Sequence, residues 1–280
     1  MMSAAGQRWI WRGAAVFFMA GLYIFLFAPL IVVAGASLDG ADRPYVSFPP
    51  ATLSLDWYGK IPPKYLQALG VSVLLAMATA IVATLIAVPA GLGLVRGRIP
   101  GKRWIAALLR APLQIPFVVT GIAFLQLYYL ISGVFGIALR GHFPGLLLGH
   151  VFLATPYAIG SVVAVLQRFN PRLEEAAQSL GAPPARVFRR VTLPIIMPGV
   201  YAGGLYAFIV SFSEVPVALF LGGPGTTTFP VEMFASMQFD FNPSLLAIST
   251  IILIVSMVAL IGLQKIIGLE ALLRAGTGRR

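Results

Sequence analysis

The chain has 280 residues, of which 59% are hydrophobic and only 10% are charged, and its mean hydropathy is +0.90. A soluble domain carries roughly a quarter charged residues, so this composition excludes an ordinary soluble protein and indicates a membrane protein. The chain has no cysteine, which excludes disulfide bonds within it and thiolate metal sites, and its net charge of +11 reflects membrane topology rather than nucleic-acid binding.

Six apolar runs reach the roughly 20 residues that a membrane-spanning helix needs. We place them at approximately 14–38, 66–95, 108–131, 146–166, 195–221 and 245–267. The expected fold is all-α, a polytopic membrane helical bundle of about six transmembrane helices. It forms a single domain over residues 1–280, with its core spans at about 66–268. The first run is alternatively a secretory signal that ends at Ala34-Gly35-Ala36. Its apolar stretch exceeds the usual signal core of about 7–15 residues, which favours a retained helix.

The basic residues fall mostly on one side of these spans. If the N-terminus lies inside, four basic residues lie outside: Arg43, Lys60, Lys64 and Arg140. The other sixteen lie inside: Arg8, Arg12, Arg96, Arg98, Lys102, Arg103, Arg110, Arg168, Arg172, Arg186, Arg189, Arg190, Lys265, Arg274, Arg279 and Arg280. Because cytoplasmic loops carry the excess of Lys and Arg, both termini are predicted to be cytoplasmic.

Proline and glycine mark the shape of the outer segments and the spans. Segment 40–65 is rich in proline, and segment 222–243 contains GGPGTTTFP before an apolar stretch at 231–241, which predicts a short or re-entrant helix. Gly199 and Gly203, with Gly204, permit close helix packing. Kinks are expected at Pro89, Pro112, Pro116, Pro156 and Pro216.

A polar segment at about 168–194 separates the fourth and fifth spans and reads RFNPRLEEAAQSLGAPPARVFRRVTLP. Asn170 and Pro171 are a helix start signal, and Gly181 followed by two prolines is a stop signal. A second helix is expected from about Pro184, with Pro194 at the start of the fifth span. The segment therefore predicts a cytoplasmic helical elbow, either a solvated hairpin or a docking surface for another protein.

Glu214 is the only carboxylate within a predicted span. An intramembrane charge needs a partner or a water-lined path, so Glu214, with Ser211 and Ser213, is a candidate for the substrate path. At 1.5 Å per residue it lies ~25 Å along the fifth span, close to the outer interface. The alternatives are an outer-rim residue and a structural ion pair.

The chain lacks the residues of an energy source or an active site. No G-x-x-x-x-G-K-[ST] loop is present to bind ATP, and no G-x-S-x-G motif supports an intramembrane serine protease. His142 and His150 do not occur in a metal-ligand spacing. We therefore expect no enzyme, no metal site and no cofactor bound by this chain.

The polar segment resembles the signature of the permease subunits of bacterial ABC importers, which is E-A-A, three residues, G, nine residues and I-x-L-P. Here the signature reads Glu175-Ala176-Ala177, then Gly181, then Val191-Thr192-Leu193-Pro194, with every spacing kept and Val in place of Ile. The resemblance covers about twenty positions. It implies a multi-pass permease of the bacterial inner membrane, with the fold of the methionine-importer type, that works by alternating access.

The same resemblance implies partners and residue roles. Glu175, Ala176, Ala177 and Gly181 would form the docking core for a separate ATPase dimer that uses ATP and Mg²⁺, and Leu193 and Pro194 would set the return into the membrane. A second permease subunit, expected to be a different chain, and a periplasmic solute-binding protein would complete the importer. From their position, Glu232 and Asp240 in the outer loop are candidates to meet that binding protein or to line an outer gate, although solvated loop charges are the commoner explanation.

The segments at 211–221 and 223–231 are similar to the corresponding region of spermidine/putrescine permeases. This implies a polyamine as the substrate. Permeases for aminoethylphosphonate, opines or amino-acid derivatives, iron(III) and thiamine resemble the same region and stay as alternatives. Outside the class, an ion-gradient-driven secondary transporter would have more intramembrane charges and an inverted repeat, and neither is apparent.

Overall fold

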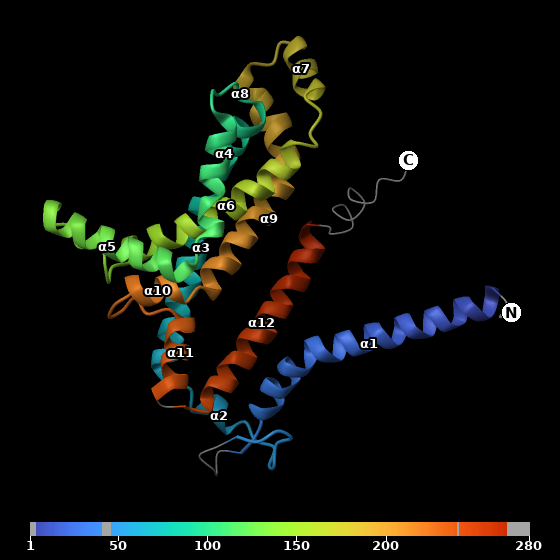
Figure 1. The fold of residues 1–280 in the computed structure, drawn as a ribbon, viewed down its shortest axis with the longest axis vertical. Coiled ribbons are helices and arrows are strands. Elements are labelled where there is room, and N and C mark those ends of the chain that lie inside the picture. The colour runs from blue at the N-terminus through green and yellow to red at the C-terminus, as the bar shows by residue number, and fades with distance from the viewer. Residues whose placement is uncertain (1–3, 41–45, 240, 268–280) are drawn as a thin grey trace. The chain divides into compact units, whose positions relative to one another are not determined.

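The computed structural model describes residues 4–40, 46–239 and 241–267 (Figure 1). Most of the described residues are helical, as predicted. In chain order the α-helices are α1 (Ala4–Ala36), α2 (Asp56–Gly59), α3 (Pro63–Arg96), α4 (Lys102–Arg110), α5 (Phe117–Phe135), α6 (Phe143–Leu166), α7 (Arg172–Ser179), α8 (Pro184–Val187), α9 (Leu193–Ser213), α10 (Pro216–Leu221), α11 (Phe229–Phe239) and α12 (Ser244–Ile267). A 3₁₀ turn, η1 (Ala111–Gln114), precedes α5, and a π-helical turn, η2 (Phe188–Thr192), precedes α9.

Five of the predicted spans are helices long and apolar enough to cross a membrane, namely α1 from Trp11 onward, α3, α5, α6 and the helical run 184–213. The sixth falls in α12, whose apolar part among the described residues is the shorter stretch Ser244–Ala259. By its internal contacts the chain divides into two compact units. One comprises Met1–Pro63 and Ser236–Arg280, and the other comprises Lys64–Ala235. The predicted single domain over residues 1–280 stays a prediction.

In the first unit, α1 and α2 both contact α12. The most apolar stretch of α1 contains no buried residue, and burial begins only near the end of the helix, where Ala36 is buried. The apolar surface of that stretch is therefore left for lipid or another subunit. After α1 the chain is held by Asp39, whose carboxylate accepts the Ser47 and Ala51 N–H groups at 2.8 Å each. Hydrogen bonds, above all the one from the Ser47 backbone, lower the pKa of the Asp39 carboxyl to about 2.

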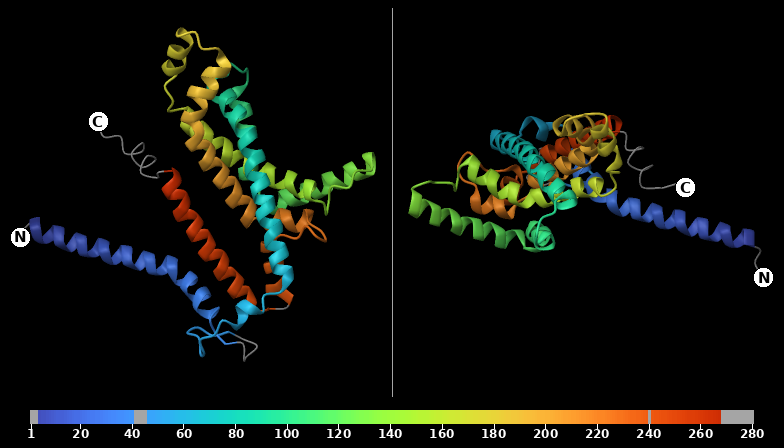
Figure 2. Two further views of the ribbon diagram at one scale, coloured as in Figure 1. Left: turned by 180° about the vertical axis from the view of Figure 1, so that it is seen from behind. Right: turned by 90° about the horizontal axis from the view of Figure 1, so that it is seen from above.

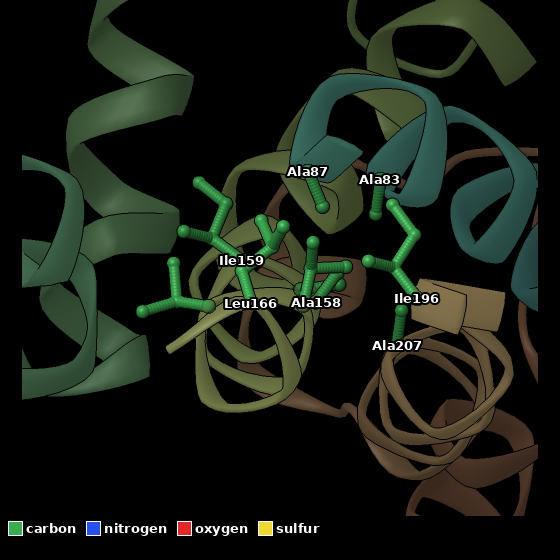
Figure 3. Packing of buried hydrophobic residues seen from close by; sticks show 10 residues of the cluster. Ala83, Ala87, Ala158, Ile159, Leu166, Ile196 and Ala207 are labelled. Carbon is green, nitrogen blue, oxygen red and sulfur yellow. The ribbon is translucent and has the colours of Figure 1, made fainter. Parts of the chain in front are cut away.

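The core of the second unit lies where α3, α6 and α9 meet (Figure 3). Small side chains make this contact possible: Ala83 and Ala87 of α3, Ala158 of α6 and Ala207 of α9 are all fully buried. At Gly203 a Cβ atom would lie 3.0 Å from the Ala158 Cα atom, so α6 and α9 touch backbone to backbone. This agrees with the close packing expected of the glycine pair.

A second apolar cluster joins α5, α6 and α10. Val217 and Leu221 of α10 are fully buried against Leu146 and Leu153 of α6. The Tyr128 hydroxyl of α5 donates to the Gly145 carbonyl oxygen at 2.7 Å, which satisfies the one polar atom of this ring in an apolar setting. The cluster fixes α10 against α5 and α6.

Two predicted spans differ from the helices that form. The run 108–131 is broken between α4 and α5, because Pro112 lies in the 3₁₀ turn and Pro116 immediately precedes α5. The run 195–221 is broken at Glu214, which is extended, and α10 restarts at Pro216. Proline lacks a backbone N–H and ends helices at such positions. Pro89 and Pro156, by contrast, lie inside the continuous helices α3 and α6.

Candidate functional site

The predicted helical elbow is present between α6 and α9. The Asn170 side-chain oxygen accepts the Arg172 N–H at 3.1 Å, and α7 follows. At its other end Gly181 has φ +81°, the Gly181 N–H donates to the Gln178 carbonyl at 2.9 Å, and the Ala182 N–H donates to the Ala177 carbonyl at 3.1 Å. These two bonds form a Schellman motif, in which a residue with positive φ ends the helix.

Beyond the elbow, the chain enters the membrane helix without a break. The run from α8 through η2 to α9 is one helix over residues 184–213, so Pro194 lies within it rather than at its start. The tolerance of Pro194 follows from the π-helical turn before it, which already departs from the regular hydrogen-bond ladder. The second half of the elbow, α8, is thus continuous with the membrane helix α9. The carboxyl end of α3 lies at the same end of the second unit as α7 and α8 (Figure 1 and Figure 2).

The residues predicted to dock another subunit form a mostly exposed face of this elbow. Glu175, Ala176 and Gly181 are exposed, and Ala177 is half-buried. Leu180, which directly follows α7, adds an apolar side chain to this face and is 89% exposed. In the signature's second half, Leu193 is half-buried and Pro194 is exposed.

The neighbouring carboxylate, Glu174, is held inside the elbow. Arg96 Nη1 at the end of α3 lies 2.5 Å and 2.6 Å from its two oxygens, and the Thr192 hydroxyl donates to the Glu174 Oε1 atom. The Arg96 guanidinium also lies over the Phe169 ring, 4.7 Å from its centroid. Sequence reasoning missed this cluster because Arg96 and Glu174 are 78 residues apart and no local spacing connects them.

Glu214 occupies the break between α9 and α10 and is 3% exposed. Its carboxylate oxygens accept the N–H groups of Val217 at 2.7 Å and Ala218 at 2.9 Å, so it caps the first turn of α10. His150 Nε2 of α6 lies 3.8 Å from Glu214 Oε2, and both side chains are fully buried. No local spacing in the sequence indicates this pairing, because 64 residues separate His150 from Glu214.

The two serines predicted beside Glu214 have different surroundings. The Ser211 hydroxyl lies 2.9 Å from His150 Nδ1 and donates to Thr79 Oγ1 at 3.2 Å, so Ser211 extends the buried polar cluster to α3. Ser213 is exposed, and its hydroxyl donates to the Ile209 carbonyl within α9. The structure therefore brings Ser211, but not Ser213, together with Glu214 through His150.

The outer-loop acids are placed only in part. Glu232 of α11 forms an ion pair with Lys64 at the start of α3, with a distance of 2.8 Å between Lys64 Nζ and Glu232 Oε1. Asp240 lies outside the described residues. The stretch predicted as a short helix is α11, which follows the turn of the GGPGTTT segment, and the Ser72 hydroxyl of α3 accepts the Phe229 N–H at 2.8 Å at its start.

An apolar hollow of 680 Å³ lies beside α4, α5 and α6, with Phe124, Tyr128 and Thr155 among its lining residues. The lining contains no charged side chain, so this hollow offers no counter-charge for an ionic solute.

Comparison with known proteins connects these features. The family model described as "Binding-protein-dependent transport system inner membrane component" matches residues 83–269. The chain is 33% identical over 234 residues to the putrescine transport system permease protein PotI of Escherichia coli (strain K12), which covers 82% of each chain. It is 30% identical over 251 residues to the spermidine/putrescine transport system permease protein PotC of the same strain, covering 89% of this chain and 92% of PotC.

Two solved structures share the fold. A bacterial ABC transporter that imports the acidic polysaccharide alginate matches with a TM-score of 0.74 at 16% identity, covering 95% of this chain and 98% of that chain. The MetNI methionine ABC transporter in an inward-facing conformation matches with a TM-score of 0.55 at 19% identity, covering 74% of this chain and 98% of that chain. The predicted methionine-importer-type fold is thereby confirmed.

These matches favour binding-protein-dependent transport over the two rival predictions, an intramembrane protease and an ion-gradient transporter. The matched region contains the complete signature from Glu175 to Pro194 and four of the membrane helices. The chain belongs to the family of binding-protein-dependent transport system inner membrane components, and it is a multi-pass permease subunit of an ABC importer and not an enzyme.

Proposed function

We propose that the elbow formed by α7 and α8 is the docking site for a separate ATPase and that it transmits the movement of the ATPase to α9. The observation that carries this proposal is a mostly exposed face of Glu175, Ala176, Ala177 and Leu180 on a short helix that leads through Gly181 into an unbroken run over 184–213. Small and apolar side chains on one helix fit a groove of a partner. A rigid lever carries a rigid-body motion, whereas a floppy loop would dissipate it.

The remaining partners follow from the family. An ATPase dimer binds ATP and Mg²⁺, a second and different permease subunit completes the pore, and a periplasmic binding protein delivers the solute. The exposed apolar surface of α1 and the apolar hollow beside α5 support a second membrane partner, because another membrane helix can pack against apolar surface that this chain leaves uncovered. Both termini and the elbow face the cytoplasm, as the distribution of basic residues indicates.

The docking proposal is tested by purifying the detergent-solubilised importer through a tag on the permease and measuring how much ATPase comes with it. Glu175→Arg reverses the charge of the exposed face, and Gly181→Asp adds a charge beside it; each abolishes ATPase association or ATP-driven uptake. The matched control is Asp56→Arg, which reverses an exposed charge in the other unit and leaves association unchanged. Full ATP-driven uptake by both elbow variants would refute the docking role.

For the transported solute, we propose a polyamine. The support is the identity to PotI and PotC, whose names give putrescine and spermidine/putrescine transport. A sulfate transport system permease protein, CysT of Salmonella typhimurium, is also 30% identical, over 184 residues that cover 62% of this chain, so likeness in this family does not by itself fix the solute. The cognate periplasmic protein sets most of the selectivity. Titrating it with putrescine, spermidine, aminoethylphosphonate, iron(III) and thiamine separates the candidates, and binding of another of these without a polyamine would overturn the choice.

For Glu214 we propose that it serves the substrate path by fixing α10 rather than by meeting the solute in this conformation. Both of its oxygens already accept N–H groups of the first turn of α10, and its side chain is fully buried beside His150. Glu214→Gln keeps one acceptor oxygen, so it lowers uptake of a polycation and of a neutral solute analogue alike. A loss confined to cationic solutes would instead make Glu214 a direct counter-charge, and normal polyamine uptake would remove it from the path.

A further inference from the structure

The carboxylate that precedes the signature is positioned to join three elements. Glu174 lies in the first turn of α7, Arg96 is the last residue of α3, and Thr192 ends η2 just before α9. Arg96 Nη1 lies 2.5 Å and 2.6 Å from the two Glu174 oxygens, and the Thr192 hydroxyl donates to the first of them. One side chain of α7 is thus bonded to the end of α3 and to the helical run that continues into α9.

The surroundings make this link strong. The side chains of Arg96 and Glu174 are only 28% and 16% exposed, and Thr192 is buried. The Phe169 ring covers the guanidinium at 4.7 Å from its centroid. Charge-assisted hydrogen bonds are about twice as strong as neutral ones, and partial exclusion of water strengthens them further.

The link also connects α7 to α3. The main contacts of α7 with other helices are to α8 and η2, which continue into α9, and they leave α3 out. The side-chain bond from Glu174 to Arg96 connects α7 to α3. Without it, α7 would be held mainly by its contacts to α8 and η2 and could tilt against α3.

We propose that Glu174 is a positioning residue that, with Arg96 and Thr192, forms a latch: the latch fixes the docking helix to α3 and α9 so that both membrane helices move when α7 moves. The inference rests on the docking role proposed above. Glu174 faces inward and is no part of the exposed docking face, so its loss leaves ATPase association intact and weakens the coupling of ATP hydrolysis to transport.

The first readout is the position of α7, which requires no knowledge of the solute. Because the chain has no cysteine, spin labels can be attached at Gln178→Cys on α7 and at the exposed Leu85→Cys on α3 in the assembled importer. The distance between the labels forms one narrow distribution in the otherwise unchanged chain. Glu174→Gln and Arg96→Gln broaden it. Arg98→Gln, which removes a neighbouring exposed arginine, does not.

The second readout is transport per ATP hydrolysed in proteoliposomes, with putrescine as the probe. Glu174→Gln and Arg96→Gln lower this ratio about tenfold, the scale of one lost charge-assisted hydrogen bond. Thr192→Val, which keeps the ion pair, lowers it less, and the exchange Arg96→Glu with Glu174→Arg restores it in part. A merely structural brace would lower the yield or the melting temperature and leave the ratio unchanged.

The outcomes of these experiments distinguish the latch from the docking role of the elbow. A broadened distance and a lower ratio with the ATPase still bound support the latch. An unchanged distance and ratio in Glu174→Gln overturn it, as does loss of the ATPase that the charge exchange does not restore, because Glu174 would then belong to the docking face. If Glu175→Arg and Gly181→Asp both keep full ATP-driven uptake while Glu174→Gln broadens the distance, the docking role fails and the positioning of α7 stands.

Discussion

Gly181 sets the angle between α7 and the helix that continues into the membrane. Its φ of +81° lies in the left-handed region, which L residues with a Cβ atom avoid. A Cβ atom built there meets nothing within 4 Å, so a substitution acts through the backbone conformation and not through a clash. Replacing Gly181 therefore costs only the free energy of holding a residue with a Cβ atom in the left-handed conformation, about 1–2 kcal/mol for most residues and less for asparagine.

The matched variants Gly181→Val and Gly181→Asn use this difference. If the elbow must keep its shape to dock the ATPase, 1–2 kcal/mol lowers the docking-competent population by about 5–30-fold in Gly181→Val, since that is what such energies do to a two-state ratio. In Gly181→Asn the docking-competent population stays close to that of the unmodified chain. The Kd of the purified ATPase for the permease in nanodiscs, measured by titration with a fluorescent ATPase, gives the factor directly. Equal Kd values for Val and Asn would refute the reasoning, since only a backbone cost distinguishes them here.

Two further predictions concern the two units separately. Gly203→Val forces α6 and α9 apart at Ala158 and costs about 1–3 kcal/mol of stability, which lowers the melting temperature in detergent. The control Gly160→Val, whose added Cβ atom meets nothing within 4 Å, changes the melting temperature little, and equal shifts would contradict the close packing. The Asp39 carboxyl, with its pKa lowered to about 2, stabilises the segment around Ser47 fully above pH ~4 and loses this effect as the pH falls toward about 2. Proteolysis of that segment therefore rises over this window, and Asp39→Asn shows the faster cleavage already at pH 7.

Much of this architecture could be predicted from the sequence because it depends on local patterns. The apolar runs gave the membrane helices, since a bilayer imposes one length on all of them. The elbow was predictable for a similar reason: Asn170 caps a helix and Gly181 ends it through the chemistry of their own positions. The residues proposed to dock the ATPase were identified from a signature whose spacing is complete, and their role stays a prediction.

The parts that escaped prediction depend on contacts between distant residues. Nothing near Glu174 indicates that Arg96 binds it, and nothing near Glu214 indicates that His150 lies beside it. The break after Ser213 was hidden because Glu214 and Val215 continue an otherwise apolar run, and only the capping of α10 by the carboxylate makes the break stable. The packing of α3, α6 and α9 brings these residues together, and the local patterns of a single sequence do not reveal that packing.

The central claim is that the exposed face of the elbow touches an ATPase, and photo-crosslinking from Leu180 tests it most directly. At 89% exposed, Leu180 can be replaced by a photoreactive phenylalanine analogue without disturbing the core. After illumination of membranes that contain the assembled importer, we expect a covalent adduct between this chain and the ATPase. We expect none from the same analogue at Val134, an exposed position on α5. An importer that hydrolyses ATP and transports its solute yet gives no ATPase adduct from Leu180 would contradict it.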